Sequence, residues 1–72
     1  MNMQVFKTPY QIEHETRDLA IYNEYNELMS VEGQSSLLVS EHLMKKYNIH
    51  SIGTIYAIRK RVAKHLNKEQ AI

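Results

Sequence analysis

The feature that most constrains the fold is a stripe of branched apolar residues near the end of the chain. Ile55, Ile58, Val62 and Leu66 follow one another at spacings of i, i+3, i+7 and i+11. At about 100° per residue, this spacing places all four side chains on one face of a helix, whereas a strand would divide them between two faces. The stripe therefore predicts a helix over residues 52–67 that packs on a core.

A second helix is predicted over residues 36–47. Val39 and Leu43 are four positions apart and share one helical face. Ser35 or Ser36 is a suitable N-cap, because a serine side chain accepts a hydrogen bond from a free backbone N–H of the first turn. The segment is therefore read as a short helix with its own apolar face.

A longer helix is predicted over residues 9–29. Thr8 and Gln11 have the spacing of a capping box, and Pro9 suits the first helical position. Its second half carries an apolar stripe made by Ile21, Tyr25 and Leu28. The sequence therefore predicts an all-α domain of three helices that packs around these three stripes.

Two apolar residues of the first helix lie off its stripe. They are Ile12 and Leu19, and the helix either breaks near residues 16–18 or continues and presents them to another surface. That surface is either the N-terminal arm, residues 1–7, which we expect to be flexible, or a second copy in a homodimer. The sequence leaves both alternatives open.

The length and composition indicate one small domain over residues 1–72. A chain of this size buries only about 60% of its unfolded surface, so its core is thin. The absence of cysteine excludes disulfides and thiolate metal sites. We find no membrane-spanning apolar run and no secretory signal, so we expect a cytoplasmic protein that does not enter a membrane.

The charges are divided between the two halves of the chain. Residues 1–41 carry seven acidic and two basic side chains, whereas residues 42–72 carry seven basic and one acidic. The resulting net charges of −5 and +6 add to the overall +1. Such an asymmetry points to a polyanionic partner such as nucleic acid.

The turn between the last two helices has its own signals. Asn48 adopts the left-handed conformation more readily than most residues and therefore suits a helix end. Ile49 is expected to be a buried plug, and Ser51 is expected to cap the following helix. Together these residues predict a tight connection between two helices.

Residues 36–62 resemble a bacterial or phage helix-turn-helix of the transposase, resolvase and small-regulator type. The resemblance rests on Val39 and Leu43, on the turn at residues 47–49, and on Thr54, Ile55, Tyr56 and Ile58. It covers about a third of the chain, or two thirds with the first helix. Asn48 replaces the usual turn glycine, and the spacing from Ile49 to Thr54 is one residue longer than the common pattern.

The resemblance implies sequence-specific binding of double-stranded DNA by a recognition helix, residues 52–66, in the major groove. On a helical wheel, the face opposite the apolar stripe presents small, aromatic and basic side chains. The residues predicted to contact DNA are Ser51, Gly53, Thr54, Tyr56, Ala57, Arg59, Lys60, Arg61 and Lys64. The implied protein is a small transcriptional regulator, or a mobile-element or phage accessory protein.

The alternative function is a protein–protein interaction module with the same three-helix bundle and no DNA binding. Enzymatic activity is not expected, because the chain has no cysteine nucleophile and no glycine-rich phosphate loop. His14, His42, His50 and His65 match no metal-binding spacing. We therefore expect no catalytic residue, no cofactor, no metal and no small-molecule substrate.

Overall fold

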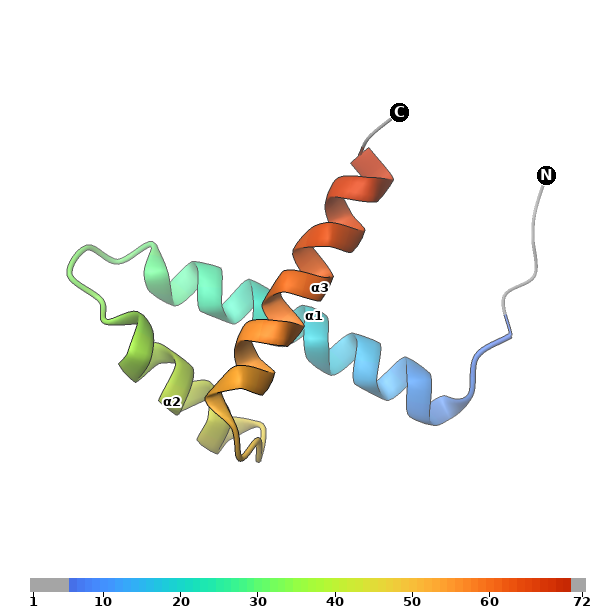
Figure 1. The fold of residues 1–72 in the computed structure, drawn as a ribbon, viewed down its shortest axis with the longest axis horizontal. Helices are drawn as coiled ribbons and strands as arrows, with labels where there is room; N and C mark the ends of the chain where they lie inside the picture. The colour runs from blue at the N-terminus through green and yellow to red at the C-terminus, as the bar shows by residue number, and fades with distance from the viewer. Residues whose placement is uncertain (1–5, 71–72) are drawn as a thin grey trace.

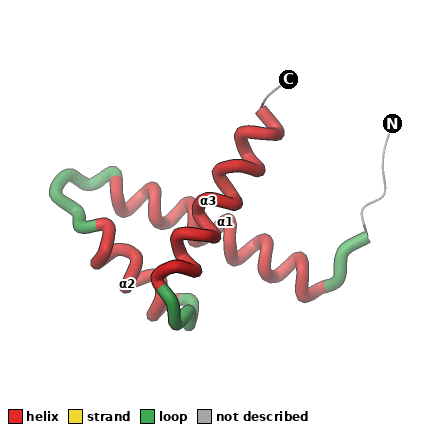
Figure 2. The backbone as a smooth tube through the Cα atoms, viewed as in Figure 1, coloured by secondary structure: helices red, strands yellow, loops and turns green. Residues whose placement is uncertain are grey.

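The computed structural model describes residues 6–70, and the side chains of residues 6–67. In this part of the chain there are three helices and no strand (Figure 1). The helices are α1 (Pro9–Met29), α2 (Ser36–Lys46) and α3 (Ile52–Gln70). Two short loops connect them (Figure 2). The predicted all-α, three-helix fold is confirmed.

The helix boundaries agree closely with those predicted. α2 ends one residue before the predicted Tyr47, and α3 continues to Gln70, beyond the predicted 52–67. α1 is unbroken through residues 16–18, so the alternative with a break at this point is wrong. The predicted arm, residues 1–7, lies mostly outside the described residues.

The start of α1 has the predicted capping box. The Gln11 N–H donates to the Thr8 hydroxyl at 3.1 Å, and the Thr8 N–H donates to the Gln11 carboxamide oxygen at 2.9 Å. These two bonds satisfy donors that a helix start otherwise leaves without partners. A cap of this kind stabilises a helix by about 1 kcal/mol.

The core lies where the three helices meet, and each helix packs on the other two. Its centre consists of one large side chain from α1, one from α2 and two from α3. These are Ile21, Leu43, Ile55 and Ile58, each exposed by no more than 1%. Tyr25, Val39 and Ile49 complete the buried cluster, and Val62 packs against it. The three predicted stripes therefore form one core, except for Leu66, which lies outside the cluster.

The turn between α2 and α3 is built around Asn48. Its φ angle of 55° lies in the left-handed region, as predicted. The backbone N–H of Ile49 donates to the carbonyl of Met44 at 2.8 Å, the bond expected when a left-handed residue closes a helix. Ile49 is buried, so the predicted plug is confirmed. The turn fixes the direction in which α3 leaves α2.

α1 and α3 cross near their middles and then diverge (Figure 1). The first half of α1 and the second half of α3 therefore extend beyond the core. The radius of gyration is 14.0 Å, compared with about 11 Å expected for a chain of this length. Ile12 and Leu19, on the extended half of α1, remain 52% and 43% exposed.

Candidate nucleic-acid interface

The outer face of α3 is exposed along most of its length. Ile55 and Ile58 point into the core, and this fixes which residues of the helix point outward. Gly53, Ala57, Lys60 and Lys64 are all exposed on that opposite face. The arrangement places two small residues and two lysines on one continuous surface.

The first turn of α3 adds an aromatic and an aliphatic side chain to this surface. Tyr56 is 62% exposed and Ile52 is 45% exposed. Ser51 and Thr54 are also exposed, and the Thr54 N–H donates to the Ser51 carbonyl at 3.1 Å. That bond at the helix start involves the Ser51 backbone, whereas the sequence had suggested a cap by its side chain.

Arg59 lies at the boundary between this surface and the core. Its guanidinium carbon is 3.4 Å from the centre of the Tyr25 ring, a geometry in which cation and aromatic face attract one another. Its Nε is buried and makes no hydrogen bond with the described residues. The guanidinium group therefore already packs within the protein.

Arg61 forms an ion pair that the sequence had not suggested. Its guanidinium donates to the carboxylate of Asp18 in α1, and Arg17 donates to the same carboxylate at 2.8 Å. The Asp18 side chain is only 8% exposed, whereas that of Arg61 is 63% exposed. Arg61 thus links α3 to α1 while much of its side chain still contacts solvent.

The sequence did contain a signal for the burial of Asp18. It lies three residues before Ile21 and seven before Tyr25, on the same helical stripe. A carboxylate on a buried stripe requires a cationic partner, because an unpaired buried charge is costly. Periodicity therefore indicated that Asp18 has a partner, but it did not indicate which arginine that would be.

A third polar contact joins α1 to α2. The carboxylate of Glu24 accepts hydrogen bonds from the Lys46 ammonium and from the Tyr47 hydroxyl. The hydrogen bond from Lys46, followed by that from Tyr47, lowers the pKa of Glu24 below its ordinary value. The same carboxylate raises the pKa of Lys46 and of Tyr47. Lys46 is therefore engaged within the protein.

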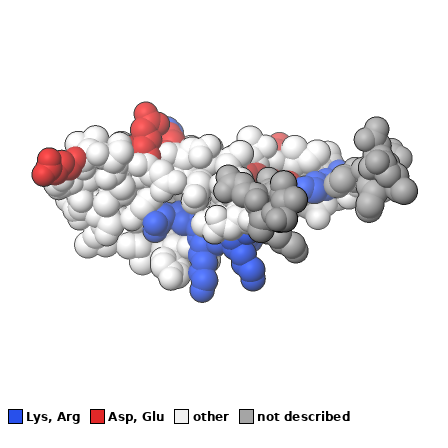
Figure 3. All heavy atoms as spheres, turned by 90° about the horizontal axis from the view of Figure 1, so that it is seen from above, with Lys and Arg blue, Asp and Glu red and all other residues white. Residues whose placement is uncertain are grey.

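Charged side chains are unevenly distributed on the face drawn in Figure 3. In Figure 3 basic side chains project together from one edge of the view, and acidic atoms lie towards the opposite edge. Lys60, Arg61 and Lys64 are exposed on α3, and the sequence from Ile52 to Asn67 contains no acidic residue. Over residues 52–67 the outer side of α3 therefore presents positive charge without a carboxylate from the same stretch of the helix.

Comparisons with protein-family models, curated proteins and solved structures find no significant match to the chain. Among residues 6–70, no helix is long and apolar enough to cross a membrane. No three His, Asp or Glu side chains of the described part come together as metal ligands. The candidate interface is accordingly argued from the geometry and charge of this chain.

Proposed function

We propose that the protein binds double-stranded DNA by placing α3 in the major groove. The observation that carries the proposal is the outer face of α3, where exposed small, aromatic and basic side chains lie opposite the buried Ile55 and Ile58. The major groove of B-DNA is wide enough to admit a helix. A tight turn preceded by a supporting helix is the arrangement in which such a recognition helix is normally held.

We assign three roles to the exposed residues. Gly53 and Ala57 leave room for close approach of the helix to the groove floor. We assign Tyr56 and Lys60 to base edges, and Lys64, further along the helix, to a phosphate backbone. Base contacts specify the sequence, whereas the phosphate contacts supply most of the affinity.

The start of α3 offers a further phosphate contact. The first backbone N–H groups of a helix have no partners within the helix and favour an anion. Ser51 and Thr54 are exposed beside them, and their hydroxyl groups are additional donors. We assign these two residues to the phosphates of one DNA strand, and Lys64 to a phosphate further along the groove.

The two arginines contribute differently from the lysines. Arg59 packs on Tyr25, so we assign it to holding α3 on the core. Arg61 is shared with Asp18 but remains largely exposed, so it contributes to the positive field near the phosphates. Lys60 and Lys64, whose side chains are exposed, are the principal cations of the proposed interface.

The proposed biological role follows from the size of the interface. One helix in one groove buries a small area, so a single copy binds weakly and gains useful specificity through a second module or copy. We propose that the chain acts as a small transcriptional regulator, or as a mobile-element or phage accessory protein, in the cytoplasm of a bacterial cell. No enzymatic step is part of the proposal.

The salt dependence of duplex binding tests this function. Three phosphate contacts predict a slope of log K against log salt of about −3, or about a 40-fold loss of affinity between 50 and 200 mM salt. Fluorescence anisotropy with a labelled duplex measures this slope. Lys64→Gln should reduce the slope by about 1, whereas Lys45→Gln, on the exposed side of α2, should change it little.

A protein-binding module remains the second candidate function. Leu37 and Leu38 at the start of α2 are 53% and 63% exposed, and Val31 in the preceding loop is 56% exposed. Single exposed apolar residues are common on soluble proteins, so this observation ranks below the α3 face. Absence of binding to any duplex at low salt would overturn the DNA proposal and favour this second candidate.

A further inference from the structure

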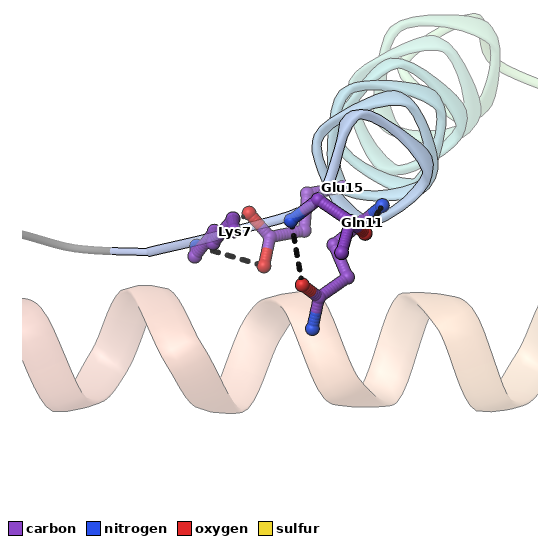
Figure 4. Close-up of polar contacts among 4 residues, drawn as sticks. Lys7, Gln11 and Glu15 are labelled. Atoms are coloured by element: carbon purple, nitrogen blue, oxygen red, sulfur yellow. Dashed lines mark hydrogen bonds and ion pairs between the residues drawn. The ribbon is translucent and has the colours of Figure 1, made fainter.

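The diverging halves of α1 and α3 enclose a groove on the side of the molecule away from the proposed DNA surface. Its volume is about 400 Å³. The apolar part of its lining comes from Leu19 of α1 and from Val62 and Leu66 of α3. Lys7 and Glu15 lie at its edge, where they form an ion pair at 2.6 Å (Figure 4).

The described part of the chain leaves this groove open. Leu19 is 43% exposed, and Ile12, two turns earlier on the same helical face, is 52% exposed. Phe6, the aromatic residue of the preceding arm, is itself 83% exposed, so it does not provide a cover. Of the predicted arm, residues 1–7, only Phe6 and Lys7 are described, so the alternative in which the arm contacts these residues stays a prediction.

The groove and the proposed DNA surface lie on different faces of α3. Val62 is two residues from both Lys60 and Lys64, which places it about 160° around the helix from each of them. A partner in the groove therefore leaves the lysine face accessible. The inference that follows does not depend on DNA binding.

We propose that the groove receives the first half of α1 from a second copy of this chain, in a two-fold symmetric homodimer. Each copy has a groove and a protruding helix, so a two-fold axis places the helix of each copy in the groove of the other. Four helix halves then form a short antiparallel cluster, the usual way for amphipathic helices to bury their apolar faces. Ile12 and Leu19 of each copy face Val62 and Leu66 of the other.

The entering half of α1 and the α3 wall of the groove carry opposite charges, whereas the α1 side of the groove holds Lys7, Glu15 and Asp18. The entering half of α1 carries Glu13 and Glu15, both exposed. The α3 side of the groove carries Arg61, which pairs with Asp18 of its own copy but remains 63% exposed. A second copy thus brings acidic side chains towards an exposed arginine, whereas α3 against α3 would bring two basic helices together. A contact between short helix halves is small, so we expect micromolar dimerisation.

Sedimentation equilibrium over a wide concentration range tests the dimer directly. The wild-type protein should change from its monomer mass of 8.5 kDa towards twice that value as concentration rises. Leu19→Glu should weaken the association by at least about tenfold, because it places a charge in the apolar contact. Ile12→Ala should weaken it by a smaller factor.

Leu38→Glu is the matched control, since Leu38 is also an exposed leucine but lies on α2 outside the groove. It should dimerise as the wild type does. Circular dichroism should show the same helix content for all variants, because every substituted side chain is at least 43% exposed. A wild-type protein that stays monomeric at every concentration, or equal weakening by Leu19→Glu and Leu38→Glu, would overturn the proposal.

Discussion

The guanidinium carbon of Arg59 lies 3.4 Å from the centre of the Tyr25 ring, so this basic residue of α3 packs against Tyr25, a core residue of α1. The contact joins two helices that are far apart in the sequence. The contact also gives Arg59 an environment different from that of Lys60 and Lys64, which are exposed. Arg59 stabilises the position of α3, whereas Lys60 on the next position faces solvent.

The first prediction concerns this contact. Arg59→Ala should reduce the free energy of unfolding by about 1–2 kcal/mol, because it removes both the cation–aromatic attraction and the packing of the arginine stem. Lys60→Ala, one position along and exposed, should change it by less than about 0.5 kcal/mol. Urea denaturation measures both. Equal stability of the two variants would contradict a structural role for Arg59.

The second prediction concerns Asp18, which holds Arg17 and Arg61. Asp18→Asn should reduce the free energy of unfolding by about 1–2 kcal/mol, since the amide replaces a largely buried carboxylate that accepts charge-assisted hydrogen bonds. Glu13→Gln is the control, because Glu13 is an exposed carboxylate on the same helix. Thermal unfolding of both at neutral pH distinguishes them, and indistinguishable midpoints would argue against the α1–α3 ion pair.

The third prediction is a pH dependence that arises from Glu24. Hydrogen bonds from Lys46 and Tyr47 lower its pKa in the folded protein. A lowered folded pKa stabilises the fold above the unfolded value of about 4.3, and the stabilisation is lost as the pH falls through the folded pKa. The pKa of Lys46 is raised, so the lysine keeps its charge up to at least about pH 10.

Glu24→Gln should therefore lower the melting temperature by about 2–4 °C near neutral pH. The difference from wild type should be widest between about pH 5 and 10 and should close below about pH 4. Melting curves across this range provide the measurement. A difference that stays constant down to pH 2 would show that the Glu24 carboxylate is not its source.

The fourth prediction concerns the turn at Asn48, whose φ angle is 55°. Asn48→Gly should leave the stability within about 0.5 kcal/mol, because glycine adopts this conformation without strain. Asn48→Val should reduce the stability by about 1–2 kcal/mol, because a β-branched residue is strained there. Chemical denaturation compares the pair. Equal stability of the glycine and valine variants would contradict the left-handed turn.

The sequence predicted the helices well because their signals are local. The capping box at Thr8, the serine caps before α2 and the i, i+3, i+7 stripes each lie within a few residues of the structure that they determine. The core followed from the stripes, since each helix has only one clearly apolar face. Asn48 was predictable for the same reason, because its own side chain favours the turn conformation.

The polar contacts between helices were not predictable to the same degree. Asp18 and Arg61 are 43 residues apart, and their pairing depends on the angle at which α1 and α3 cross. Arg59 and Tyr25 meet for the same reason. A helical wheel assigns Arg59 to an edge of α3, but only the packed structure places the Tyr25 ring beneath that edge.

The groove depended on tertiary structure as well. The sequence identified Ile12 and Leu19 as apolar residues off the main stripe, and the structure places Leu19 opposite Val62 and Leu66. The lengths of α1 and α3 cause both helices to extend beyond the crossing. The groove is therefore a property of the helix crossing rather than of any single helix.

The central claim is that the outer face of α3 contacts duplex DNA, and an NMR titration tests it most directly. Adding a duplex to ¹⁵N-labelled protein in low salt should shift amide signals of Gly53, Ala57, Lys60 and Lys64, and leave those of Ile12 and Leu19 nearly unchanged. Raising the salt should reverse the shifts. No shifts on addition of duplex, or shifts confined to α1, would contradict the account.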